Sequence, residues 1–311
     1  MAEVVRVDNL SRSFGETDAL DSISFSVEEG EIFGLVGPDG AGKTTCLRIL
    51  CGLMAPSSGQ VRVLDQDMAL DPEPAKDRIG YMAQPARLYE ELSVLENIRF
   101  YADIHEVPPE RYRERMNRLL EFSGLSPFTE RLFRNLSGGM KQKVGLTCAL
   151  IHSPRVLFLD EPTNGVDPVS RRDFWKILYE LRRERVTIVV ASTYLDEVDR
   201  CHRVALFDKG RIRLLMAPTQ MRALITGSLY NLIVPDRQKA LKVLRSVPQV
   251  IRSSVFGTGI HFTTEKDGDV SEVEKSLLAS GLSSFEVKPI TASLEDVYLS
   301  LVLEKEEAAE R

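Results

Sequence analysis

This chain of 311 residues has few cysteines, no long apolar run and no excess of basic residues. Its four cysteines, Cys46, Cys51, Cys148 and Cys201, have no paired metal spacing and stand among apolar residues, so we expect reduced thiols in the core. No apolar run approaches the roughly 18 residues of a membrane span, and the first residues lack the pattern of a signal peptide, which predicts a cytosolic chain. The net charge of −6 gives no support to nucleic-acid binding.

Strand-like and helix-like segments alternate over residues 1–222. Hydrophobic residues make up 43% of the chain and charged residues 28%, which is typical of a globular protein. Continuous apolar runs such as "RVLFLDEP" and "VTIVVAST" favour strands that are buried in a parallel sheet, and the segment between them has helical spacing. We therefore predict an α/β fold with a mainly parallel core sheet, covered on both faces, and a helical subdomain at about 85–150.

The pattern changes after about residue 225. Residues 226–311 follow the order strand, helix, hairpin, helix, strand, which predicts a small C-terminal α+β domain of the split β-α-β type. Ser293 and Asp296 resemble a capping box for a final helix, "SLEDVYLSLVLEKEEAAER", whose charged last residues we expect to fray.

The stretch "GLVGPDGAGKTT" follows a predicted strand and opens a predicted helix, which is the context that a P-loop requires. Glycines allow backbone N–H groups to surround phosphates, while Lys43 can reach the terminal phosphates and Thr44 can hold Mg²⁺. The motif alone leaves kinases, GTPases and ATPases open. The predicted loop residues are Gly37, Pro38, Asp39, Gly40, Ala41, Gly42, Lys43, Thr44 and Thr45.

Two acidic residues follow the apolar run "VLFL". The strand would place Asp160 at its carboxyl end, where ligands bind in open α/β sheets. There Asp160 could reach the Mg²⁺ shell, and Glu161 could activate a water for attack on the terminal phosphate. An ordinary solvated loop is the alternative, but the P-loop favours the catalytic interpretation.

The stretch "LSGGMKQ" resembles a second phosphate-binding turn, because a hydroxyl and two glycines precede a helix-forming run. Ser137, Gly138 and Gly139 are its candidate residues. A helix cap that only satisfies its own N–H groups is the alternative. A chain with a P-loop has no evident need for a second phosphate site about a hundred residues away.

These three stretches in this order resemble the ATP-binding cassette family, whose signature is LSGGQ-like, and the resemblance covers residues 4–220. It implies ATP and Mg²⁺ as ligands and a second cassette as partner, in a homodimer or a heterodimer. In that family two cassettes pair head to tail, so the signature residues cap the nucleotide that the partner's P-loop holds. The C-terminal segment and its "SLEDVYLSL" ending are similar to the small domain of exporter cassettes.

The resemblance also implies roles for single residues. Phe14 matches the aromatic residue that stacks on adenine, although a phenylalanine at a strand end is as often part of the core. Gln84 matches the glutamine that links Mg²⁺ to the helical insertion and the membrane partner, and a plain polar loop residue is its alternative. Asp167 matches the loop acid that communicates across the dimer.

Two positions depart from the family pattern. Asp39 stands where the family has asparagine, which adds a negative charge near the triphosphate. Thr193 stands where the family has a switch histidine that contacts the γ-phosphate and orients water. Threonine is shorter and cannot carry a positive charge, so a slow or degenerate site is one expectation. His202, which we expect on the following helix, is a weak candidate to replace the histidine.

The resemblance implies the ATP-hydrolysing subunit of an export-type transporter, which works on separate transmembrane permease subunits as a peripheral protein at the cytoplasmic face of the membrane. One alternative is a regulatory cassette that binds ATP but hydrolyses it poorly. Another is a non-transport cassette that acts on ribosomes or DNA, although its usual second cassette, coiled coil or basic segment is not evident here. The chain could also be one half of a longer tandem protein, because its charged tail would suit a linker.

Overall fold

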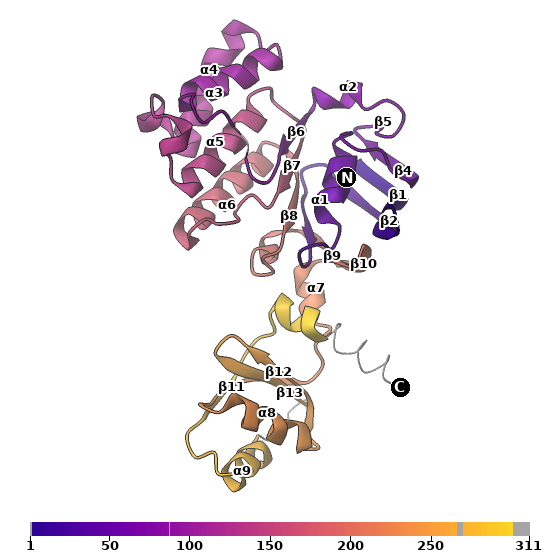
Figure 1. Ribbon diagram of the computed structural model, residues 1–311, viewed down its shortest axis with the longest axis vertical. Coiled ribbons are helices and arrows are strands. Elements are labelled where there is room, and N and C mark those ends of the chain that lie inside the picture. The colour runs from indigo at the N-terminus through magenta and orange to yellow at the C-terminus, as the bar shows by residue number, and fades with distance from the viewer. Residues whose placement is uncertain (1, 87, 266–269, 301–311) are drawn as a thin grey trace. The chain divides into compact units, whose positions relative to one another are not determined.

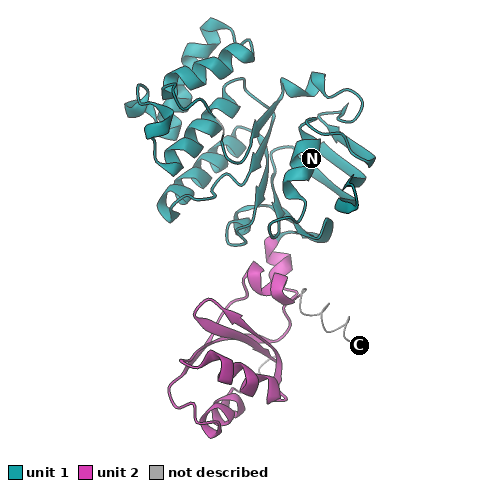
Figure 2. Cartoon of the chain, viewed as in Figure 1, with its two compact units in different colours: residues 1–217 teal, residues 218–311 magenta. Residues whose placement is uncertain are grey.

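The computed structural model describes residues 2–86, 88–265 and 270–300. The chain forms two compact units, Met1–Ala217 and Pro218–Arg311, which are shown in Figure 2. Within the described residues no helix combines the length and apolar character needed to cross a membrane. All four cysteines are free and buried, as the sequence predicts.

A six-stranded sheet forms the centre of the first unit, with the strand order β10-β9-β3-β8-β7-β6 (Figure 1). Its inner strands pair in parallel and only β10 is antiparallel to its neighbour, which confirms the predicted mainly parallel core sheet. Every residue of β3, β7 and β8 is buried, because both faces are covered. The strands are β3 (Ile32–Val36), β6 (Ile79–Met82), β7 (Val156–Asp160), β8 (Thr187–Ser192), β9 (Arg203–Asp208) and β10 (Arg211–Met216).

A second, antiparallel sheet in this unit has the order β2-β1-β4-β5. The first 36 residues alternate between apolar and polar in the manner of strands, which predicts β1 and β2 correctly. That pattern does not extend to β4 and β5, and it does not indicate a separate sheet. Helix α1 (Lys43–Leu50) contacts strands of both sheets and lies between them (Figure 1). The strands are β1 (Glu3–Phe14), β2 (Thr17–Glu28), β4 (Ser58–Val63) and β5 (Gln66–Asp67).

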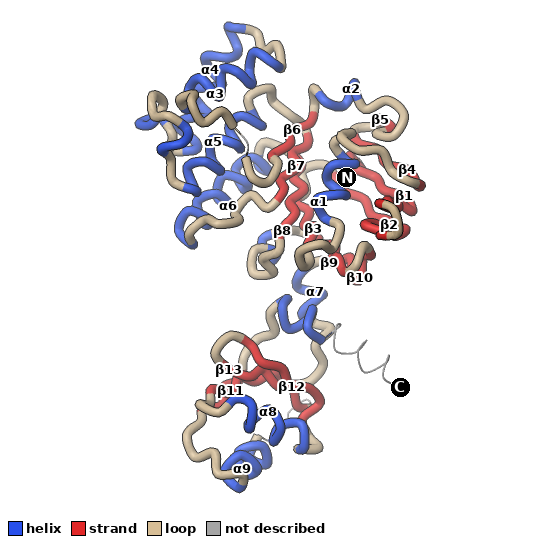
Figure 3. Tube along the Cα trace, in the orientation of Figure 1, coloured by secondary structure: helices blue, strands red, loops and turns tan. Residues whose placement is uncertain are grey.

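Helices cover the side of the central sheet that faces away from α1, as Figure 3 shows. α5 contacts β6 and α6 contacts β8, and both helices bury apolar residues. α6 is amphipathic, whereas α5 is buried on all sides from Val144 to Leu150. A short helix, α2 (Glu73–Lys76), precedes β6. The covering helices are α3 (Val94–Ile104), α4 (Pro109–Ser123), α5 (Gly138–Leu150) and α6 (Pro168–Arg183), with short 3₁₀ turns at Ser126–Phe128, Phe133–Asn135 and Val198–Arg200.

The second unit contains a four-stranded antiparallel sheet with the order β12-β13-β11-β14. Its apolar core lies between this sheet and helices α8 and α9. Residues 294–300 are helical, and Ser293 and Asp296 form the predicted capping box. The predicted remainder of that helix, residues 301–311, lies outside the described residues. The other elements are α7 (Pro218–Arg222), β11 (Ser228–Ile233), α8 (Arg237–Ser246), β12 (Val250–Phe256), β13 (Gly259–Thr264), α9 (Ser271–Ala279) and β14 (Glu286–Pro289).

Candidate functional site

The glycine-rich loop 37–42 connects the carboxyl end of β3 to the first turn of α1. Gly42 is the N-cap of α1 and has a φ of 103°, a conformation that favours glycine. A Cβ atom at Gly42 would lie 2.4 Å from the carbonyl oxygen of Ala19, so a side chain there would collide with the backbone of β2. The loop can therefore follow this path only with glycine at position 42.

Lys43 is the first residue of α1, and its side chain is buried under the loop. Its Nζ donates hydrogen bonds to the carbonyl oxygens of Gly37 and Pro38 at 2.8 and 3.0 Å. The same nitrogen lies 3.4 Å from Oε1 of Glu161. Because a buried charge needs partners, this ammonium holds the loop and the end of β7 together.

Asp160 is the last residue of β7 and is almost fully buried. Its Oδ1 accepts a hydrogen bond of 3.0 Å from the hydroxyl of Thr44 in α1. Burial raises the pKa of Asp160, and the Thr44 hydrogen bond and the nearby Arg48 act in the opposite direction. A desolvated carboxylate with a hydroxyl beside it is a favourable place for a cation.

Glu161 follows directly and has a φ of 48°, which is unusual for a residue with a side chain. Its backbone N–H donates to the carbonyl of Ala191 in β8, which fixes this turn of the chain. Oε2 of Glu161 accepts hydrogen bonds from both the backbone N–H and the hydroxyl of Thr193, at 3.1 and 3.2 Å. Such backbone strain, held in place by neighbouring strands, is frequent at active sites.

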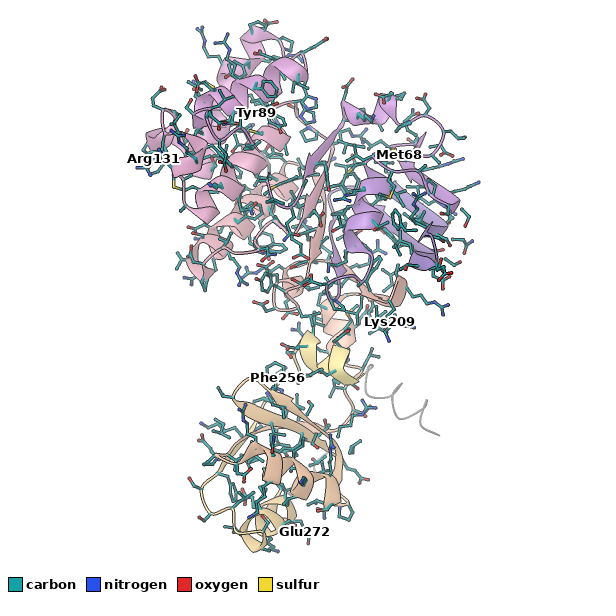
Figure 4. The ribbon with its side chains drawn as sticks, in the orientation of Figure 1. Met68, Tyr89, Arg131, Lys209, Phe256 and Glu272 are labelled. Atoms are coloured by element: carbon teal, nitrogen blue, oxygen red, sulfur yellow. The ribbon has the colours of Figure 1, made fainter. Side chains whose placement is uncertain are left out.

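A cavity of 160 Å³, lined by Lys43, Thr44 and Glu161 among others, lies at the carboxyl ends of the parallel strands. Gln84, which is exposed on the loop after β6, lines it together with Glu161 and the P-loop. Tyr89, labelled in Figure 4, lies further along the same loop, just before α3. The described residues that line the cavity are Ala19, Asp39, Gly40, Ala41, Gly42, Lys43, Thr44, Thr45, Gln84 and Glu161.

The signature-like turn lies elsewhere in this unit and contributes no residue to that cavity's described lining. Ser137 is the N-cap of α5, and its hydroxyl accepts the N–H of Met140 at 3.3 Å. Ser137 and Gly138 are exposed, whereas Gly139 is buried against Ser170 of α6, where a Cβ atom would come within 2.7 Å. The turn is therefore capped internally and also presents an exposed hydroxyl and backbone.

Phe14 and Asp167 lie outside the cavity lining. Phe14 ends β1, is 46% exposed, and has the guanidinium of Arg12 4.7 Å from its ring centroid. A core position, which was the alternative for Phe14, does not fit this exposure. Asp167 is the N-cap of α6 and accepts the N–H groups of Val169 and Ser170.

The expectation that His202 lies on a helix after Thr193 is wrong. His202 precedes β9 and lies on no helix, and its Nδ1 accepts the N–H of Ile32 at 3.1 Å. Ile32 begins β3, so His202 lies at the amino end of the parallel strands, whereas the P-loop lies at their carboxyl ends. No imidazole from this position can reach Glu161.

Comparisons with known proteins identify the family of this chain. The ABC transporter family model matches residues 20–164. The daunorubicin resistance ATP-binding protein DrrA2 of Streptomyces coeruleorubidus is 31% identical over 98% of this chain and 97% of its own length. The chain belongs to the ABC transporter family. It is also 36% identical, over 96% of its residues, to the probable multidrug ABC transporter ATP-binding protein YbhF of Escherichia coli (strain K12), although it spans only 52% of that protein.

Solved structures place the cassette in the same family. The structure of cbiO1 from Clostridium perfringens, part of the ABC transporter complex cbiONQ, has a TM-score of 0.66 and 26% identity over 80% of this chain and 97% of that chain. The ATP-binding cassette MJ0796, in a dimeric post-hydrolysis state bound to ADP and Pi, has a TM-score of 0.63 and 25% identity over 68% of this chain and 98% of that chain. Membership in this family implies that the cassette binds ATP.

Proposed function

We propose that this cassette is the ATP-binding and ATP-hydrolysing subunit of an export-type ABC transporter. It would act on separate transmembrane permease subunits, at the cytoplasmic face of the membrane. The main support is that Lys43, Thr44 and Glu161 line one cavity at the carboxyl ends of the sheet. Asp160 accepts a hydrogen bond from Thr44, and Thr193 donates to Glu161, so both lie directly behind that lining. The names of its relatives, which include daunorubicin resistance and Nod factor export proteins, support export as the direction.

The side chains around the cavity fit Mg-ATP. Lys43 and the backbone of loop 37–42 would hold the phosphates, since the ammonium now satisfies itself on loop carbonyls and can exchange them for phosphate oxygens. Thr44, Asp160 and Gln84 would hold Mg²⁺, which when bound neutralises charge on the phosphates. Among the described residues no group of three or more His, Cys, Asp or Glu side chains has an arrangement that could hold a metal ion, and Mg²⁺ in nucleotide sites needs only one or two carboxylates.

Glu161 would act as the general base. Thr193 fixes one carboxylate oxygen through two hydrogen bonds, so the direction of the carboxylate is set before any substrate arrives. The other oxygen, Oε1, faces Lys43. Once phosphate competes for the ammonium, Oε1 is the atom that can take a proton from water.

The signature turn would act in trans. Ser137 and Gly138 are exposed and do not line the cavity of their own chain, which suits a role at a partner's nucleotide. In a head-to-tail dimer each nucleotide would lie between one P-loop and the other chain's signature. Asp167 and Phe14 would take their family roles at the dimer contact and the adenine, respectively.

A regulatory cassette with slow hydrolysis is the second candidate, and the contacts of Thr193 favour it. The hydroxyl proton of Thr193 is already donated to Glu161, so this side chain offers no donor to a γ-phosphate while that bond persists. Loss of one such stabilising contact costs about 10²–10³ in rate.

Single-turnover cleavage at saturating Mg-ATP separates the two candidates. We expect slow cleavage by the wild type and faster cleavage by Thr193→His if the site is degenerate. Rapid wild-type cleavage that Thr193→His does not improve would show a fully active ATPase. Glu161→Gln should cleave more slowly than the wild type and accumulate the ATP-bound dimer, and unchanged turnover would remove Glu161 from the mechanism. Mass analysis of the native protein, purified from membranes, identifies the permease and any fused second cassette.

A further inference from the structure

The buried carboxylate of Glu197 joins two loops that the proposed mechanism treats separately. Glu197 is 3% exposed and follows Thr193 on the loop after β8. The hydroxyl of Thr163 lies 2.7 Å from each of its carboxylate oxygens. Thr163 is itself buried and belongs to the turn between Glu161 and Asp167. A hydrogen bond to a buried charge is among the stronger contacts in a protein, so these loops are closely tied.

Arg171 of α6 reinforces the same connection. Its Nη1 lies 3.7 Å from Oε1 of Glu197, and its Nε donates to the carbonyl of Val166 at 3.2 Å. Its guanidinium also lies 4.2 Å from the ring centroid of Tyr194, the residue after Thr193. Glu197 therefore connects the segment 193–197, through Thr163 and Arg171, to both ends of the turn 163–167.

Burial of the Glu197 carboxyl group carries an energetic cost. Burial raises the pKa of Glu197, while the Thr163 hydrogen bond and the charge of Arg171 lower it. A purely structural contact could be apolar at less cost, because replacing a buried ion pair with apolar packing is often neutral or stabilising. A polar contact at this position instead fixes the geometry of the two segments relative to each other.

We propose that Glu197 is a positioning residue for ATP cleavage: by fixing segment 193–197 to turn 163–167, it sets the Thr193–Glu161 hydrogen bonds and transmits movement of turn 163–167 to them. The proposal rests on the function proposed above. Turn 163–167 ends at Asp167, the residue that the family resemblance places at the partner cassette. Contact with a partner at this turn would then reach Glu161 through Glu197 and Thr193.

The test compares Glu197→Gln with Asp196→Asn, a matched loss of charge on the neighbouring residue. The Asp196 side chain is 76% exposed and also lies within 3.9 Å of Arg171, so it controls for the charge near that guanidinium. A second pair removes and restores the hydroxyl at position 163, as Thr163→Val and Thr163→Ser. Each protein is assayed for amide hydrogen exchange without nucleotide, for Mg-ATP affinity and for single-turnover cleavage.

We expect Glu197→Gln and Thr163→Val to raise exchange in both segments, 163–167 and 193–197. They should slow cleavage about 10- to 100-fold, the scale of a small misplacement, with Mg-ATP affinity within about twofold of the wild type. Thr163→Ser and Asp196→Asn should behave like the wild type. The proposal would be overturned if amide exchange rose in only one of the two segments, or if Mg-ATP affinity fell together with the cleavage rate. It would also be overturned if Asp196→Asn had the same effect as Glu197→Gln. A wild type that cleaves no ATP would refute the proposed function. The exchange data would then still show whether Glu197 fixes segments 163–167 and 193–197 to each other.

Discussion

Acid should weaken the first unit through His152, which follows the end of α5. Its Nε2 lies 2.9 Å from the carbonyl oxygen of Ile79 in β6, and its buried Nδ1 has no hydrogen-bond partner among the described residues. Its ring stacks on that of His105 with centroids 3.8 Å apart. Burial, followed by the neighbouring His105, lowers the pKa of His152 from 6.5 to about 4.

The sign of the effect follows from proton counting. Between about pH 6.5 and 4 the unfolded chain binds a proton at this imidazole and the folded chain does not. The contribution of neutral His152 to the free energy of unfolding is therefore complete above about pH 6.5 and is lost as the pH falls towards 4. Proton linkage at this one imidazole lowers the free energy of unfolding by about 2 kcal/mol between pH 7.5 and pH 5.

The perturbation is His152→Gln, whose amide can still donate to Ile79 but cannot take up a proton. Urea unfolding is followed by tryptophan fluorescence, because the single tryptophan of the chain, Trp175, is buried in α6 and so reports on this unit alone. The wild type should lose about 2 kcal/mol more than His152→Gln on going from pH 7.5 to 5. Equal losses in the two proteins would refute the reasoning.

Further predictions concern the nucleotide site and a buried amide. Lys43→Ala should weaken Mg-ATP binding severely, and near-normal affinity by calorimetry would exclude the P-loop assignment. Asp160→Asn should abolish the part of ATP affinity that depends on Mg²⁺; titrations with Mg²⁺ and with EDTA measure this, and a difference as large as that of the wild type would show that Asp160 holds no metal. Asn97 is fully buried, and its side-chain oxygen accepts the N–H of Tyr89. Its side-chain nitrogen donates to the carbonyl oxygens of Tyr89, Leu92 and Ser93. Asn97→Ala should therefore cost about 1–3 kcal/mol in urea unfolding, because it leaves those groups unpaired, and a change under about 0.5 kcal/mol would contradict this.

Local signals predicted much of the fold. The continuous apolar run before Asp160 specifies a buried strand, and a glycine loop followed by a helix specifies the turn above Lys43. The capping box at Ser293 and Asp296 is equally local, since its partners are three residues apart. Each of these features is determined within a few residues of the chain.

Local signals did not predict which strands pair, or which side chains come into contact, when they are far apart in the sequence. Alternation identifies β1 and β2 as strands, but it cannot show that they pair with β4 in a separate antiparallel sheet. The contact between Thr163 and Glu197 spans 34 residues and has no local signature. His202 illustrates the same limit, because only the tertiary fold reveals that its partner is the N–H of Ile32, at the far end of the strands.

The central claim is that each ATP site combines the P-loop of one cassette with the signature of another. A mixture of two inactive variants tests it most directly: Lys43→Ala removes the P-loop charge, and Ser137→Arg blocks the signature turn while leaving ATP binding to its own chain intact. Each variant alone should hydrolyse no ATP, whereas an equal mixture should regain up to about a quarter of wild-type activity, because half of the dimers join unlike chains and each of these holds one intact site. No recovery in a mixture whose chains are shown to pair, or loss of ATP binding by monomeric Ser137→Arg, would contradict the account.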